Sequence, residues 1–129
     1  MILLDTHTLL WLFTDSASLG PSSRALISGA KSVGYSSISV AEIAIKHMLG
    51  RLDLPGGEAF PGVFEEMGLE QIAFTSSQAA ILLDEPDLVR HDPFDRLLFA
   101  QSVGAGRTLI TTDRVLLGLG SDWTHDARR

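Results

Sequence analysis

The sequence predicts an α/β fold, in which helices cover both faces of a mainly parallel central sheet in a three-layer α/β/α arrangement. Short apolar segments alternate along the chain with segments of helical periodicity, which is the pattern of parallel strands joined by right-handed crossovers. The first apolar segment, Met1 to Leu4, has no polar face, as expected for a central strand covered on both sides. Because ligands of such sheets bind beyond the carboxyl ends of the strands, the fold class also indicates where a site would lie.

Apolar periodicity, together with glycine, proline and serine at the boundaries, predicts the elements in order. We expect strands at 1–4, 33–38, 71–74 and 108–111, and helices at 6–13, 24–31, 39–49, 58–67, 76–83, 93–103 and 114–117. Ser39 is the expected N-cap of the third helix, which puts Glu42 in its first turn. Pro93 suits a first helical position, so the sixth helix is expected to begin at Asp92 or Pro93. The tail after Gly120 is polar.

Length and composition limit the classes of protein that remain. A chain of 129 residues is expected to form one domain over 1–129. Hydrophobic residues make up 45% of the chain and the mean hydropathy is +0.20, which suggests that some apolar surface faces a partner. There is no cysteine, no basic leader and no apolar run of about 18 residues, so we expect a cytoplasmic protein without a membrane segment.

The net charge of −6 argues against binding nucleic acid by phosphate neutralisation alone. A bound divalent metal ion would reverse the local sign, and acids are placed to hold one. Asp5 and Asp113 stand at the ends of predicted strands, and Glu42, Asp92 and Asp95 stand near the starts of predicted helices. Helix capping or the helix dipole could explain each acid singly. Together, however, they would repel one another at one sheet edge, and a cation resolves such repulsion.

Other chemistries fit the sequence poorly. The four histidines lack the short spacing of a zinc site, and there is no phosphate-cradling glycine loop and no Gly-x-Ser-x-Gly elbow. An Asp-x-Asp phosphatase is excluded because His7 takes the second acidic position after Asp5. A phospho-receiver domain would need paired acids after the first strand, where Asp5 stands alone.

The acids fall within four motifs: Leu3-Leu4-Asp5-Thr6-His7, Ser39-Val40-Ala41-Glu42-Ile43, His91-Asp92-Pro93-Phe94-Asp95-Arg96-Leu97-Leu98 and Thr111-Thr112-Asp113. With these motifs the chain resembles a PIN domain over almost its whole length, and more closely the VapC-type toxins of bacterial toxin-antitoxin operons. The third motif is the most specific. The polar tail departs from relatives that end in a further hydrophobic strand.

The resemblance implies an endoribonuclease that depends on Mg²⁺ or Mn²⁺, is neutralised by a cognate antitoxin and often forms a homodimer. The family's four acidic positions carry over onto Asp5, Glu42, Asp95 and Asp113, as metal ligands and catalytic residues. Asp92 resembles an extra acid of the subgroup and could be a ligand or a helix cap. Thr6 and Thr111 match hydroxyl positions beside the metal site.

A catalytically inert PIN-like module that binds protein or RNA is the alternative, and the complete acid set argues against it. Two apolar segments, 11–13 and 45–49, are where a partner surface would be sought, although core packing explains most of their residues. The basic residues that could guide an RNA backbone are Lys46, Arg51, Arg96 and Arg114, although each is more often a solvated charge on a helix face.

Overall fold

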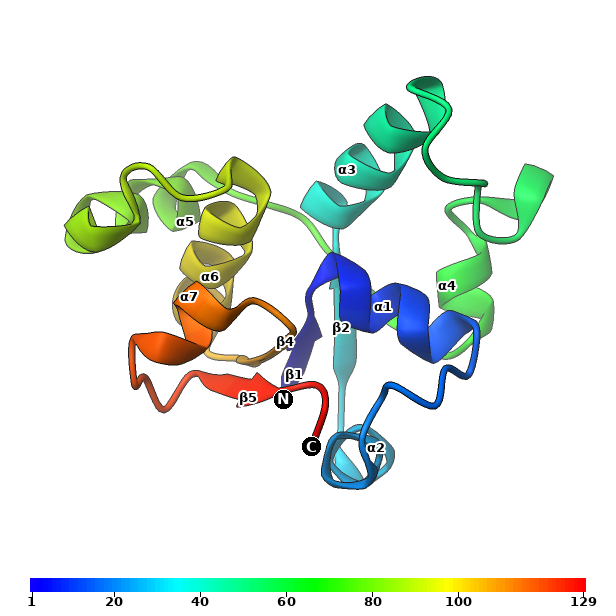
Figure 1. The fold of residues 1–129 in the computed structure, drawn as a ribbon, viewed down its shortest axis with the longest axis horizontal. Helices are drawn as coiled ribbons and strands as arrows, with labels where there is room; N and C mark the ends of the chain where they lie inside the picture. The colour runs from blue at the N-terminus through cyan, green and yellow to red at the C-terminus, as the bar shows by residue number, and fades with distance from the viewer.

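The computed structural model describes residues 1–129 and has a five-stranded, all-parallel sheet in the order β3-β2-β1-β4-β5. The strands are β1 (Ile2–Leu4), β2 (Val33–Ser36), β3 (Glu70–Ile72), β4 (Thr108–Thr111) and β5 (Thr124–Asp126). Helices cover both faces, with α6 and α7 on one side of β1 and β2 and α1 and α4 on the other (Figure 1). The predicted three-layer architecture is confirmed.

The helices follow the strands as the alternating pattern predicted. They are α1 (Thr6–Phe13), α2 (Pro21–Gly29), α3 (Ser37–Met48), α4 (Val63–Glu66), α5 (Ser76–Ala80), α6 (Pro93–Ala105) and α7 (Arg114–Gly118). Single turns of 3-10 helix lie at η1 (Gly57–Ala59), η2 (Ile81–Asp84) and η3 (Pro86–Leu88). No helix is long and apolar enough to cross a membrane.

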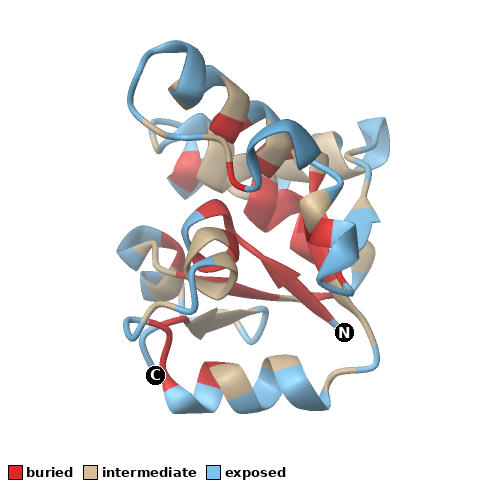
Figure 2. Cartoon of the chain, turned by 90° about the vertical axis from the view of Figure 1, so that its right-hand side faces the viewer, coloured by how far each residue is buried: buried red, intermediate tan, exposed pale blue.

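The two faces of the sheet have separate cores, because side chains alternate along a strand. Ile2 and Leu4 of β1 pack in a cluster with Leu9 of α1 and Phe64 of α4, whereas Leu3 packs in a second cluster with Leu98 of α6. The buried residues accordingly follow the strands through the middle of the molecule (Figure 2). The uniformly apolar first segment is therefore the central strand, as predicted.

Some local predictions are wrong. The predicted helix 58–67 is divided into η1 and α4. The helix that carries Glu42 begins at Ser37, because the hydroxyl of Ser36 accepts the N–H of Ile38 as the N-cap. The strand before it consequently ends at Ser36 rather than residue 38, and Glu42 lies in the second helical turn instead of the first.

The polar tail, whose sequence lacks a hydrophobic strand, nevertheless forms β5. This strand lies at the edge of the sheet and pairs in parallel with β4. An edge strand needs only one partner, and its backbone hydrogen bonds do not depend on apolar side chains. Ala127, just beyond the strand, is fully buried in the first core cluster.

Candidate functional site

Asp5 follows β1 directly and is the buried centre of the carboxyl edge, with 1% of its surface exposed. One carboxylate oxygen, Oδ1, accepts the N–H of Thr8 at 2.8 Å and so caps α1. The other, Oδ2, accepts the hydroxyl of Thr111 at 2.7 Å and the N–H of Thr112 at 3.0 Å. Asp5 therefore ties β1 to the loop after β4, and Oδ1 keeps one free lone pair.

Glu42 lies on α3, is largely buried and contacts Thr6, the residue that follows Asp5. Its Oε1 accepts the hydroxyl of Thr6 at 2.7 Å, and its Oε2 pairs with Lys46 one turn later at 2.6 Å. The Thr6 hydroxyl oxygen also lies 3.0 Å from the hydroxyl of Ser39. Two donors, Thr6 and Lys46, thus hold Glu42. Lys46 is one of the basic residues that the sequence suggested for contact with RNA.

Asp113 begins α7, and its two carboxylate oxygens have different partners. Oδ1 accepts the N–H of Leu116 at 2.9 Å, so Asp113 is the N-cap that its position predicted. Oδ2 lies 2.9 Å from Nε2 of His91. Burial alone would raise the pKa of Asp113, but the Leu116 N–H, the neighbouring Asp95 carboxyl and His91 outweigh it and lower this pKa.

Asp95 lies in the first turn of α6, and its carboxyl group has no backbone N–H partner. Burial first, then contact with the Asp113 carboxylate and more weakly the charges of Asp5 and Asp92, raise the pKa of Asp95 to about 8. The pKa of Asp95 is thus raised and that of Asp113 lowered, although the two carboxyl groups are neighbours. A carboxyl group in this position gains most from a nearby cation.

Asp92 is the N-cap of α6, which is one of the two roles predicted for it. Its Oδ1 accepts the N–H of Phe94 at 2.9 Å and the N–H of Asp95 at 3.2 Å, and the side chain is exposed. Pro93 occupies the first helical position. Capping therefore accounts for Asp92 without a metal.

His91 contacts the acids of the cluster. The sequence did not predict this contact. Its Nε2 lies 2.9 Å from Asp113 and 4.0 Å from Oδ2 of Asp95. Ligand atoms of His91, Asp95 and Asp113 all lie within 4.8 Å of one another, which makes these three side chains a possible metal-binding cluster. The signal available in the sequence was the four-residue spacing of His91 and Asp95; the contact with Asp113, 22 residues away, depends on the fold.

The donor chemistry of the cluster fits a divalent metal ion. Carboxylate oxygens suit Mg²⁺ and Mn²⁺, and imidazole suits Mn²⁺ less well than it suits later transition metals. Asp5 stands beside the cluster with a free lone pair on Oδ1, since its charge acts on Asp95. Arg96, by contrast, is engaged within the protein, because its Nη1 donates to the Val89 carbonyl at 2.8 Å.

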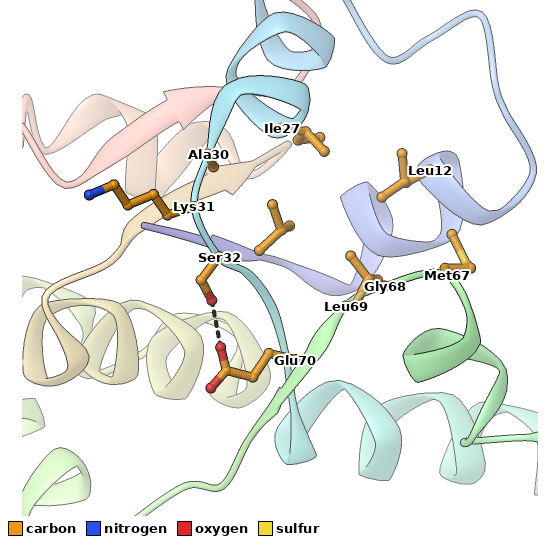
Figure 3. A pocket seen from close by; sticks show the side chains of 10 residues that line it. Leu12, Ile27, Ala30, Lys31, Ser32, Met67, Gly68, Leu69 and Glu70 are labelled. Carbon is orange, nitrogen blue, oxygen red and sulfur yellow. Dashed lines mark hydrogen bonds between the residues drawn. The ribbon is translucent and has the colours of Figure 1, made fainter.

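One hollow of the surface lies away from these acids. It has a volume of about 410 Å³ and lies where the end of α2, the start of β2 and the segment 67–70 meet (Figure 3). Most of its lining is apolar, and its one acid, Glu70, is already bound to Ser32 and Arg107. This hollow therefore offers no unpaired acid to a metal ion.

Comparison with known proteins shows a shared fold. Among similar solved structures, a chain of a toxin-antitoxin complex from Klebsiella pneumoniae has a TM-score of 0.68 and 15% identity, with 98% of each chain covered. A chain of VapBC2 from Rickettsia felis, bound to a promoter DNA fragment, has a TM-score of 0.67 and 17% identity, with 92% of each chain covered. A chain of FitAB bound to a DNA fragment has a TM-score of 0.64 and 19% identity, covering 100% of this chain and 96% of that one.

No family model and no curated protein matches the chain. At 15 to 19% identity the solved structures establish the fold alone. The chain has the PIN-like α/β fold of proteins found in toxin-antitoxin complexes, which agrees with the resemblance carried by its four acidic motifs.

Proposed function

We propose that this protein is the toxin of a toxin-antitoxin pair and acts as a metal-dependent endoribonuclease, a hydrolase that cuts RNA phosphodiester bonds. The single observation that supports this most is the convergence of His91, Asp95 and Asp113 within 4.8 Å, beside Asp5, at the carboxyl edge of the sheet. Proteins of toxin-antitoxin complexes share the fold. A cytoplasmic location belongs to the same proposal.

The residues that would hold Mg²⁺, or Mn²⁺ in its place, are Asp5, Asp95 and Asp113, and we propose Glu42, which is hydrogen-bonded to Thr6 next to Asp5, as the fourth acid. A bound ion would lower the pKa of a water molecule and stabilise charge on the attacked phosphate. Asp113 and Asp5 are kept in position by the N–H of Leu116 and by Thr111 and Thr112. Lys46, held at 2.6 Å by Glu42, offers a positive charge toward the substrate backbone.

Apolar residues at the end of α3 support a protein partner. Ile45, Met48 and Leu49 are 45%, 83% and 61% exposed, which is unusual for three large side chains so close together. We assign this face to the proposed homodimer or to the antitoxin. Light scattering of the protein alone and with the product of an adjacent small reading frame separates these two partners.

The test of the nuclease is cleavage of total cellular RNA by the purified protein with Mg²⁺, with Mn²⁺ and with EDTA. We expect cutting with either metal and none with EDTA. The variants Asp5→Asn and Asp95→Asn should each lose about 100-fold or more of the rate, whereas the matched control Asp122→Asn, an exposed acid outside the cluster, should keep it. Metal-induced stabilisation with no cleavage of any RNA would favour an inert binding module instead.

A further inference from the structure

We propose that His91 is itself a metal ligand, through Nε2, and that it makes this site favour a transition-metal ion over Mg²⁺. This inference rests on the proposed function, because it concerns the same metal site. It adds a nitrogen donor to a set that the sequence motifs describe as oxygen only. Its first support is position: Nε2 is the atom of the ring that lies toward both Asp113 and Asp95.

The separations of the three donor atoms fit one shared ion. Atoms bound at about 2.1 Å to a common metal lie roughly 3 Å apart as neighbours and about 4.2 Å apart across the ion. Nε2 is 2.9 Å from Oδ2 of Asp113 and 4.0 Å from Oδ2 of Asp95. Both separations lie within the range that two ligands of one ion would have.

The hydrogen-bond partners of Asp113 favour binding of the ion by His91 over movement of His91 away from the site. Oδ1 of Asp113 accepts the N–H of Leu116 as the helix cap, whereas Oδ2 is the oxygen that His91 contacts, so an ion held by Oδ2 would lie close to Nε2. The His91 side chain is only 18% exposed, so it stays beside the ion, and its neutral imidazole is an ordinary metal ligand.

A nitrogen donor changes which metal the site prefers. Mg²⁺ is bound almost entirely by oxygen and keeps several of its waters, whereas imidazole binds transition metals more strongly. Removing the imidazole should therefore weaken Mn²⁺ binding much more than Mg²⁺ binding. His91→Gln is the suitable variant, because its side-chain amide can still donate to Asp113 and so preserves a purely positioning role.

The experiment uses Mn²⁺ bound to the full chain without RNA, and detects coordinated nitrogen by pulsed electron paramagnetic resonance. Wild type should show ¹⁴N coupling of a directly bound imidazole. His91→Gln should lose it, and the Mn²⁺ dissociation constant should rise about tenfold while that for Mg²⁺, measured by competition, stays within about threefold. The control His47→Gln should behave as wild type, since His47 lies on α3 and contacts the Leu52 carbonyl.

Each other outcome overturns the inference in a recognisable way. Bound Mn²⁺ without ¹⁴N coupling in wild type would leave the proposed metal site standing but reduce His91 to a positioning residue for Asp113. Coupling that persists in His91→Gln would assign the nitrogen to a different histidine. Failure of wild type to bind Mn²⁺ or Mg²⁺ at all would overturn the proposed metal-dependent function together with this inference.

Discussion

At the scale of single residues, the acids differ in how far the protein already satisfies them. Asp5, Glu42 and Asp113 accept hydrogen bonds from backbone or hydroxyl donors, whereas Asp95 has acidic neighbours and a raised pKa. Such an arrangement is unfavourable for the metal-free fold and favourable for binding a cation. Asp95 should therefore be the acid that most clearly lowers the stability of the metal-free protein while it strengthens metal binding.

We predict that Asp95→Asn leaves the metal-free protein equally stable or up to about 2 kcal/mol more stable, because it removes a buried acid that its neighbours disfavour. The same variant should lose the rise in melting temperature that Mg²⁺ or Mn²⁺ gives wild type. Thermal unfolding with EDTA and with each metal measures both effects. Asp122→Asn serves as control, and a clear loss of metal-free stability in Asp95→Asn would contradict the prediction.

The second prediction concerns Asp92. Two variants distinguish the effect of its helix cap from the effect of its charge. Asn caps a helix as well as Asp does, so Asp92→Asn should keep both the stability and the metal affinity of wild type. Asp92→Ala should lose about 0.5 to 2 kcal/mol in urea unfolding, since the N–H groups of Phe94 and Asp95 lose their acceptor. A tenfold loss of metal affinity in Asp92→Asn would instead make Asp92 a ligand.

At the scale of elements, Arg107 joins the amino edges of four strands. Its guanidinium donates to the Ile2 carbonyl and the Ser32 hydroxyl, both at 3.1 Å, and pairs with Glu70 at 3.3 Å. The hydrogen bond from Ser32 first, and then the hydrogen bond and charge of Arg107, lower the pKa of Glu70 below its usual 4.5. The edge opposite the acids is thus held together by one buried cation.

This pair should make stability depend on pH. A carboxyl pKa that folding lowers contributes stability above the unfolded value of about 4.5, and this contribution is lost as the pH falls through the folded value. Wild type should therefore be more stable than Glu70→Gln at about pH 7, and the gap should be smaller at acid pH, below the unfolded value of about 4.5. Urea unfolding at both pH values tests this, with exposed Glu58→Gln as control; an equal gap at both would contradict it.

The sequence predicted those elements whose signals are local. Asp5 follows an apolar run directly, Asp113 stands just past the end of a predicted strand, and Asp92 with Pro93 marks the start of α6, so their places could be read without the fold. The cap of α3 could not, because three serines at 36, 37 and 39 offer equivalent local chemistry. His91 and β5 could not either, since each depends on contacts with residues far along the chain.

At the scale of the whole molecule, the tail after β5 packs against the start of α2. Gly20 donates its N–H to the Ala127 carbonyl at 2.9 Å, and the Ser23 N–H donates to the Arg129 carbonyl at the same distance. A Cβ on Gly20 would lie 2.1 Å from the backbone carbon and oxygen of Arg129. The close approach of two backbones, rather than an unusual torsion, therefore requires glycine here, because its φ is −74°.

We accordingly predict that Gly20→Ala destabilises the protein by about 1 to 3 kcal/mol, since the tail must move and β5 weakens with it. The matched control is Gly29→Ala at the other end of α2, where nothing lies within 4 Å of the added atom and alanine favours the helix. Urea unfolding of both variants, with hydrogen exchange at residues 124–127, measures the effect and where it acts. Equal stability of the two variants would show that the tail does not contribute to the sheet. Loss of protection confined to β5 in Gly20→Ala would instead show that the polar fifth strand is held by its contact with α2, and not by its own sequence.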